Sequence, residues 1–212
     1  MLVDLPVKEF LDRLKSHQPT PGGGSAAALA GAVAASLAAM VVELTVRSEK
    51  HAASHAALGP IGRRATELQG ILTSLVDRDA EAYDAVVAAN RLLKGTPEEK
   101  EARSAARRQA LRLATDTPLR TAEAAAETLD CAAEALEAGI NPNAASDLGV
   151  AALLAHAALR AAAMNVEINL PGLKELSYAG EVHGRLNTLF EESDRRREGV
   201  LSEVERLLGR QA

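Results

Sequence analysis

The chain lacks most of what a β-rich, disulfide-bonded or nucleic-acid-binding protein requires. Its 212 residues include one cysteine, two tyrosines, two phenylalanines and no tryptophan. A single cysteine, Cys131, excludes an intrachain disulfide and argues against a zinc site built on cysteines. Basic residues are also fewer than acidic ones: the chain has 24 Lys and Arg and 29 Asp and Glu, which gives a net charge of −5. This balance argues against non-specific nucleic-acid binding, which needs a clustered positive field.

What the chain does contain is alanine, leucine and valine. Hydrophobic residues make up 47% of the sequence while aromatic residues make up 2%. Alanine is the best helix former, and long β-branched runs are scarce, so the composition favours closely packed helices over a sheet. The length suits one large domain. We therefore predict an all-α protein with a single domain over residues 1–212.

Two segments bear on targeting and membranes. The first residues, MLVDLPVKEFLDRL, carry acidic charges and lack the apolar segment of a secretory signal. The run from Ala26 to Val42 has about the minimum length to span a bilayer, but it is mostly alanine and Glu43 follows at once. We interpret it as a buried helix. We expect a cytoplasmic protein with neither membrane nor nucleic-acid partners.

Apolar periodicity and turn residues divide the chain into helices. Breaks are expected at Gly59-Pro60, at Lys94 to Pro97 and at Gly139 to Asn143. The expected helices cover residues 7–16, 24–50, 61–93, 97–115, 118–138, 144–165 and 173–208. Short connections predict an up-and-down bundle of six to seven long helices. In the second helix, small residues recur every four positions and predict a close helix–helix contact: Ala27, Gly31, Ala35 and Ala39.

A glycine turn precedes this second helix. Pro19-Thr20-Pro21 leads into Gly22, Gly23 and Gly24, and Ser25 follows where the helix begins. Glycines let a ligand approach the main chain, and the free N–H groups of a helix N-terminus can hold a carboxylate, a phosphate or a polar heterocycle. The alternative is a loop with a serine N-cap and nothing bound. The turn alone does not distinguish these interpretations.

An acidic segment, LVDRDAEAYDAV, lies inside the third long helix. Helical spacing places Asp77 and Glu81 on one face and Asp79 about 200° away from Asp77. With apolar neighbours on several sides, at least one carboxylate is expected to point inward, where burial raises its pKa and suits it to acid–base chemistry. The alternative is a solvated acidic face.

Further polar residues begin and end the sixth long helix. Ser146 and Asp147 open it, and either could serve as an N-cap. Asn165 lies near its end, beside apolar residues, where an amide can bind a heterocycle or simply close the helix. His51 and His55 have a spacing compatible with a metal, but the sequence suggests no third ligand, so no metal is expected.

Together, these segments resemble a known family. PTPGGGSAAALAGAVAASLAAMV, LVDRDAEAYDAV, TPEEK and SDLGVAALLAHAALRAAAMNVEINL, in this order, are similar to the formiminotransferase-cyclodeaminase C-terminal family. The resemblance covers nearly the whole chain. It implies an all-helical homodimer that acts on one-carbon tetrahydrofolates, as a cyclodeaminase or a methenyltetrahydrofolate cyclohydrolase, without a metal or nucleotide cofactor.

The resemblance also implies roles for particular residues. The second aspartate of the D-x-D motif, Asp79, corresponds to the family's proton donor and acceptor. The residues expected to line the folate pocket are Gly22, Gly23, Gly24, Ser25, Asp147 and Asn165. Where family members continue with a glycine and two basic residues after M-V-x-x-x-T, this chain has Arg47, Ser48, Glu49 and Lys50. Lys50 or Arg47 is the candidate for the contact with the anionic glutamate tail.

Two other classes of protein compete with this hypothesis. One is a non-catalytic helical dimer, either a scaffold or a folate-binding paralogue that has lost turnover, and the alanine ridge suits it equally well. The other, a ferritin-like metal bundle, is disfavoured because the central helices carry no Glu-x-x-His pair. The sequence does not choose between ammonia release and hydrolysis, because one proton shuttle serves both reactions.

Overall fold

The computed structural model describes residues 1–173 and 175–209, and within these the protein is all-α without a strand. The helices are α1 (Val7–Leu14), α2 (Gly23–Val46), α3 (His55–Arg91), α4 (Pro97–Ala138), α5 (Ala145–Leu173) and α6 (Leu176–Leu207). Short 3₁₀ helices occupy Leu2–Asp4, Glu49–Ser54 and Pro142–Ala144. The predicted fold class, a single-domain helical bundle, is confirmed.

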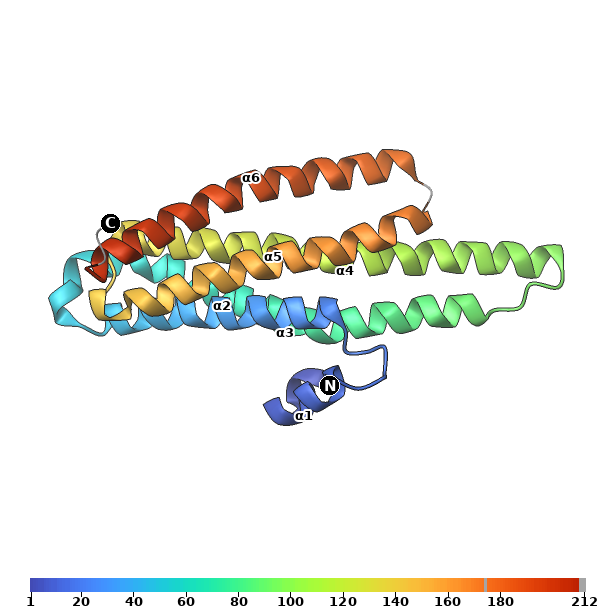
Figure 1. The fold of residues 1–212 in the computed structure, drawn as a ribbon, viewed down its shortest axis with the longest axis horizontal. Coiled ribbons are helices and arrows are strands. Elements are labelled where there is room, and N and C mark those ends of the chain that lie inside the picture. The colour runs from blue at the N-terminus through green and yellow to red at the C-terminus, as the bar shows by residue number, and fades with distance from the viewer. Residues whose placement is uncertain (174, 210–212) are drawn as a thin grey trace.

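Helices α2 to α5 run up and down as a four-helix bundle, and α6 lies across α4 and α5 (Figure 1). Each of α2 to α5 contacts its neighbours along much of its length, whereas α6 makes fewer contacts and diverges from the bundle near its N-terminus. The N-terminal α1 lies below α2 and α3 in this view. The helices pack side by side over long distances because their alanine-rich faces let the helix axes come close together.

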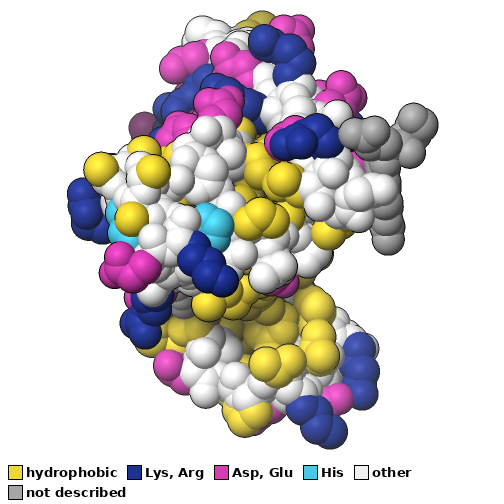
Figure 2. All heavy atoms as spheres, turned by 90° about the vertical axis from the view of Figure 1, so that its left-hand side faces the viewer, with side chains coloured by type: hydrophobic (Ala, Val, Ile, Leu, Met, Phe, Trp, Pro, Cys, Tyr) yellow, Lys and Arg dark blue, Asp and Glu magenta, His cyan; other side chains and the backbone are white. Residues whose placement is uncertain are grey.

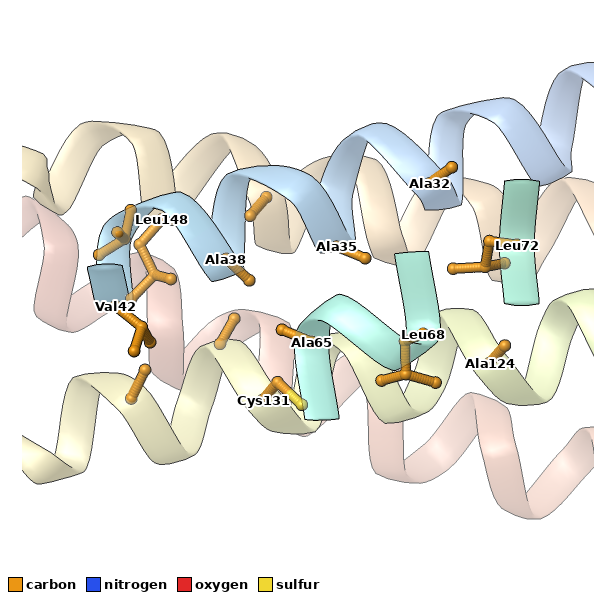
Figure 3. Close-up of a cluster of buried hydrophobic side chains, with 14 of the residues drawn as sticks. Ala32, Ala35, Ala38, Val42, Ala65, Leu68, Leu72, Ala124, Cys131 and Leu148 are labelled. Atoms are coloured by element: carbon orange, nitrogen blue, oxygen red, sulfur yellow. The ribbon is translucent and has the colours of Figure 1, made fainter. Parts of the chain in front are cut away.

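The core consists of small aliphatic side chains (Figure 3). Ala35 and Ala38 of α2 are buried in one cluster with larger residues such as Leu68 of α3. The predicted ridge of small residues on α2 packs against α3. A methyl group on Gly31 would lie 2.9 Å from a Leu72 methyl carbon, which is closer than packed carbon atoms approach. The lone Cys131 is buried in the same cluster, and burial raises the pKa of its thiol to about 11.

Proline does not break the helices where the sequence pattern predicted breaks. Residues 97–138 form one helix with Pro118 inside it, so the prediction of two helices, 97–115 and 118–138, is wrong. A proline lacks the N–H that the carbonyl four residues earlier normally accepts from. Here the freed carbonyl is that of Ala114, and it accepts a hydrogen bond of 2.8 Å from Asn169 Nδ2 of α5. A side chain from another helix thus replaces the missing donor.

Other helix boundaries also differ from the predictions. α3 begins at His55 and includes Pro60, α2 ends at Val46, and α5 continues past Asn165 to Leu173. Pro60 is the sixth residue of α3, and its missing N–H removes one intrahelical donor, the one that the Ala56 carbonyl would accept from. The extension of α5 matters for the site, because it carries Asn165 and Asn169 side by side along one helical face.

The N-terminal segment is held against α3. The backbone N–H of Leu2 donates to Asp77 Oδ1 at 2.5 Å, and Phe10 of α1 is buried in the main core cluster. Figure 2 shows hydrophobic side chains gathered in the hollow between this N-terminal lobe, at the bottom of the view, and the bundle above it. Asp77 therefore serves the attachment of this segment, and its exposed fraction is only 8%.

Helices α3 and α4 extend beyond the start of α2 as a two-helix arm (Figure 1). Asp79 lies level with the first turn of α2, so the remainder of α3 to Arg91 continues for about 18 Å past it. The N-terminus of α2 consequently lies inside the length of the molecule, flanked by α3 and by the last turns of α5. This position places its free N–H groups beside side chains from two other helices.

Candidate acid–base site

Ser25 and Asp79 form the centre of the candidate site. Ser25 is the third residue of α2 and is fully buried, and its Oγ donates to Asp79 Oδ2 of α3 at 2.9 Å. The N-cap of α2 is Gly22, without a capping side chain, so the alternative interpretation of Ser25 as an N-cap is wrong. The hydroxyl instead fixes the carboxylate of a residue 54 positions away.

Gly24 makes this contact possible. A Cβ atom on Gly24 would lie 2.0 Å from Asp79 Oδ1 and 2.5 Å from its Cγ. No side chain fits in that space, so the carboxylate lies directly against the first turn of α2. The group that approaches the main chain at this glycine is a protein carboxylate, and a ligand contact at Gly24 stays a prediction. Gly22 lies in a tight turn, with its own Cβ position 3.3 Å from the Pro19 carbonyl oxygen.

The surroundings of Asp79 raise the pKa of its carboxyl above the ordinary aspartate value. Burial has the largest effect, and the hydrogen bonds from the Ser25 hydroxyl and backbone amide act in the opposite direction. The positive end of the α2 dipole also favours the charged form. Asp79 is only partly buried, so its side chain keeps some contact with solvent. A raised pKa makes a carboxyl group better suited to take up a proton and return it.

Asn165 of α5 completes one side of the site. Its amide oxygen and nitrogen each lie 3.5 Å from the position that a Cβ on Gly23 would occupy. The Asn165 Nδ2 group donates to the Ala161 carbonyl at 2.9 Å, and the Asn165 carbonyl accepts from Asn169 Nδ2 at 2.9 Å. Gly23, Gly24, Ser25, Asp79 and Asn165 therefore meet at one place, contributed by α2, α3 and α5.

Asp147 and Lys50, the other predicted pocket residues, lie at the opposite end of the bundle. Asp147 is in the first turn of α5, so about 27 Å of helix separates it from Asn165. Lys50 lies in the 3₁₀ helix that follows the C-terminal end of α2. A single chain does not bring these two residues to Asp79.

One structural role was missed at the sequence level. The amide of Asn169, a residue not among the predicted site residues, donates to the Ala114 and Asn165 carbonyls. The available signal was Pro118, which must leave a carbonyl unpaired in any helix that contains it. Among residues 1–173 and 175–209, no group of three His, Cys, Asp or Glu side chains is arranged to hold a metal ion.

The fold and this site define an all-helical bundle that holds a half-buried carboxyl group against a helix N-terminus. Comparison with known proteins identifies the class further. Residues 6–188 match the family described as formiminotransferase-cyclodeaminase, and the chain belongs to this family. Membership identifies the chain as an enzyme.

Individual relatives cover almost the whole chain. It is 41% identical over 198 residues to the methenyltetrahydrofolate cyclohydrolase of Methylorubrum extorquens, an alignment that covers 93% of this chain and 95% of the relative. It is 32% identical over 204 residues to the formimidoyltransferase-cyclodeaminase of Mus musculus; these cover 96% of this chain but only 38% of the mouse protein.

A solved structure is also similar along the full length. The crystal structure of formiminotetrahydrofolate cyclodeaminase from Thermotoga maritima superposes with a TM-score of 0.79 at 26% sequence identity. The superposition covers 99% of this chain and 98% of that one. The family resemblance predicted from the sequence motifs is therefore confirmed.

Proposed function

We propose that this enzyme is a methenyltetrahydrofolate cyclohydrolase that uses Asp79 as its general acid and base. The observation that carries the proposal is the clamp on Asp79, in which Ser25 and Gly24 hold a half-buried carboxyl group of raised pKa beside a helix N-terminus. The near-complete alignment with a relative of that name supports the choice of hydrolysis. Gly23 and Asn165 line the same place and are proposed to contact the folate.

The proposed reaction opens the five-membered ring of 5,10-methenyltetrahydrofolate. Asp79 takes a proton from water as the water oxygen bonds to the methenyl carbon, which becomes tetrahedral. The protonated carboxyl group then gives this proton to the ring nitrogen as the carbon–nitrogen bond breaks. The second proton of the water is released to solvent as the formyl group forms. One carboxyl group thus serves both steps.

Cyclodeamination is the second candidate, because the similar Thermotoga maritima structure carries that activity in its name. In that reaction N10 attacks the formimino carbon of 5-formiminotetrahydrofolate, and the carbon–nitrogen bond to ammonia breaks. The departing nitrogen must gain a proton, which Asp79 would supply. The same geometry therefore serves either substrate, and the two are separated by assay.

A direct assay tests the proposal. Purified protein is mixed with 5,10-methenyltetrahydrofolate, and the loss of its near-ultraviolet absorbance is compared with the rate in buffer alone. We expect a large acceleration that persists after treatment with a chelator, because we propose that the enzyme needs neither a metal nor another cofactor. Ammonia release from 5-formiminotetrahydrofolate is measured in parallel. No acceleration and no ammonia, with folate binding by calorimetry, would instead establish the non-catalytic paralogue.

We further propose that the enzyme is a cytoplasmic homodimer, assembled through the outward faces of α2 and α5. Two segments are long and apolar enough to span a membrane: α2, with a mean hydropathy of 2.0, and Pro142–Leu173, with a mean hydropathy of 1.4. Only about half of the most apolar stretch of each segment is buried inside the bundle. The exposed apolar residues are Leu29, Val33, Met40 and Leu44 on α2 and Val150, Leu153, Met164 and Ile168 on α5. Glu43 is the only charged residue of α2. A second copy can cover this long apolar face.

A two-fold axis across this face brings opposite helix ends together. α2 and α5 are antiparallel neighbours, with Gly23 beside Asn165 at one end and Val42 in one cluster with Leu148 at the other. An axis through their middle would bring the Asp147 and Lys50 end of the second copy toward the Asp79 site. The sequence-predicted pocket residues then come from two subunits.

Mixing two inactive variants tests this shared site. We expect Asp79→Asn and Asp147→Asn each to lower activity, and their mixture to regain up to about a quarter of the wild-type rate, since half of the dimers formed at random carry one intact site. Sedimentation of Val33→Glu should give monomers, whereas the control Leu93→Glu, on an exposed residue of the α3–α4 turn, leaves the dimer intact. A mixture without recovered activity would contradict the shared site.

A further inference from the structure

The two carboxylate oxygens of Asp79 have different surroundings. Ser25 Oγ donates to Oδ2 at 2.9 Å, whereas Oδ1 accepts no side-chain hydrogen bond from residues 1–173 and 175–209. In this part of the chain, the enclosed side-chain oxygens without a hydrogen-bond partner are Asp77 Oδ2 and Glu123 Oε1, and Asp79 Oδ1 is not one of them. One oxygen of Asp79 is therefore held by a side chain, and the other lies on the side that is open to solvent.

The hydroxyl of Ser25 is committed to Asp79. The exposed fraction of Ser25 is 0%, and within the described part of the chain its Oγ makes this one hydrogen bond. An enclosed hydroxyl that already donates its proton offers nothing to a folate in the pocket. The sequence motif predicted Ser25 among the residues that line that pocket, but these contacts favour a role that acts through Asp79.

No charged side chain shares this role with Ser25. Across those described residues, no Lys, Arg or His nitrogen lies within 4 Å of an Asp79 oxygen. Burial raises the pKa of Asp79, and the groups that oppose this rise are the hydroxyl and the backbone amide of Ser25. The Ser25 hydroxyl is thus the side-chain group that stabilises the ionised form of Asp79.

The hydrogen bond from Ser25 is compatible with both protonation states that acid–base chemistry requires. An ionised carboxylate accepts it at Oδ2, and so does a neutral carboxyl group whose proton is on Oδ1. A proton on Oδ2 would instead point toward the Ser25 hydroxyl and disrupt the bond. The geometry therefore separates two tasks within one carboxyl group: Oδ2 anchors the side chain, and Oδ1 is free to gain and lose a proton.

From these contacts we infer that Ser25 is a positioning residue, which holds Asp79 through Oδ2 so that Oδ1 carries the transferred proton. The inference rests on the proposed function. In hydrolysis, an O–H bond of water breaks as its oxygen bonds to the methenyl carbon, and the proton goes to Oδ1. The Oδ1–H bond then breaks as the ring nitrogen gains this proton and its bond to the carbon is cleaved. Ser25 keeps its own proton throughout, and the carboxyl group does not rotate between the two steps.

The pH dependence of Ser25→Ala tests this role. We expect kcat for 5,10-methenyltetrahydrofolate to fall about tenfold, because an unanchored carboxyl group spends less time in the reactive orientation. KM should stay within about twofold, since the hydroxyl makes no contact with the folate. The low-pH inflection of kcat/KM should move to higher pH than in the wild type, because the lost hydrogen bond stabilised the charged form. Alanine is the best helix former, so α2 is expected to fold.

Ser193→Ala is the matched control. It removes another buried hydroxyl, one that donates to the Phe190 carbonyl at 3.1 Å within α6. This variant should keep the wild-type kcat and the wild-type inflection. A raised KM for Ser25→Ala with an unchanged inflection overturns the inference and indicates a folate contact. A loss of stability in urea denaturation, without a change in kcat or in the inflection, overturns it as well and indicates a structural role only.

Carbon-13 NMR of the Asp79 carboxyl carbon gives a readout that does not depend on turnover. Labelled aspartate is incorporated into the protein, and the Asp79 resonance is assigned by its absence from Asp79→Asn. Its titration midpoint should lie at higher pH in Ser25→Ala than in the wild type, and it should not move in Ser193→Ala. Equal midpoints in an active enzyme overturn the inference alone. Absence of turnover of either folate by the wild type contradicts the proposed function, and the inference with it.

Discussion

Asp79→Asn is expected to lower kcat at least about 100-fold while folate binding, measured by calorimetry, changes little. Asparagine keeps the size of the side chain, and its oxygen can still accept the hydrogen bond from Ser25. It cannot take up and return a proton. The loss therefore falls on the chemical step, and the measurement is the rate of absorbance loss with 5,10-methenyltetrahydrofolate at saturating concentration.

The control for this change is a second aspartate, Asp84, about one and a half turns further along α3. Asp84→Asn removes the same charge from an exposed side chain of α3 and should leave kcat unaltered. In the wild-type enzyme, kcat/KM should fall at low pH with an inflection above the ordinary aspartate pKa, because burial raises the pKa of Asp79. Full activity in Asp79→Asn would show that another group moves the proton.

Asp79→Asn is also expected to change the free energy of unfolding. Because the folded-state pKa of Asp79 is raised, ionising it opposes folding, and the charge costs stability above that pKa. At pH 8 the free energy of unfolding of Asp79→Asn should therefore exceed that of the wild type. The difference should shrink as the pH falls through the folded pKa of Asp79 and vanish below the unfolded value. Urea denaturation of both proteins across this pH range provides the comparison.

The fold was largely predictable because its evidence is local. Alanine-rich faces, Gly139 and the capping sequence at Thr96 act within a few residues, and the structure shows the full capping box between Thr96 and Glu99. Pro118 misled the prediction for a physical reason. The donor that rescues its helix, Asn169, is 55 residues from the carbonyl it binds. No pattern within a window of one helix contains that information.

The site was predictable only in part for a similar reason. Helical spacing separates Asp77 from Asp79, but it does not reveal that Asp77 receives the N-terminal segment while Asp79 meets α2. That assignment needs the packing of α2 against α3. Lys50 and Asp147 stay predictions, because their place in the site depends on an assembly of two chains. The family motifs named these residues without showing which subunit supplies each.

Gly24→Ala is the second change with a large expected effect. Its new methyl carbon would lie 2.0 Å from Asp79 Oδ1, far inside contact distance, so the carboxylate must leave the first turn of α2. Leaving that position breaks its hydrogen bond with Ser25 and moves the proton-transfer group by more than 1 Å. A misplacement of that size costs about 100-fold in rate, which the absorbance assay would detect. Strain at the helix contact should also lower stability by about 1–3 kcal/mol.

Two controls connect this loss to the carboxylate. Gly70→Ala changes a glycine of α3 whose Cβ position has no neighbour within 4 Å, and it should keep activity and gain about 0.5–1 kcal/mol in stability. The second control introduces Gly24→Ala into an Asp79→Ala background, where the side chain that collides is gone. The stability cost of the alanine should then largely disappear, since the two residues couple through direct contact. An unchanged cost in that background would place the strain elsewhere in the α2 turn and separate Gly24 from the positioning of Asp79.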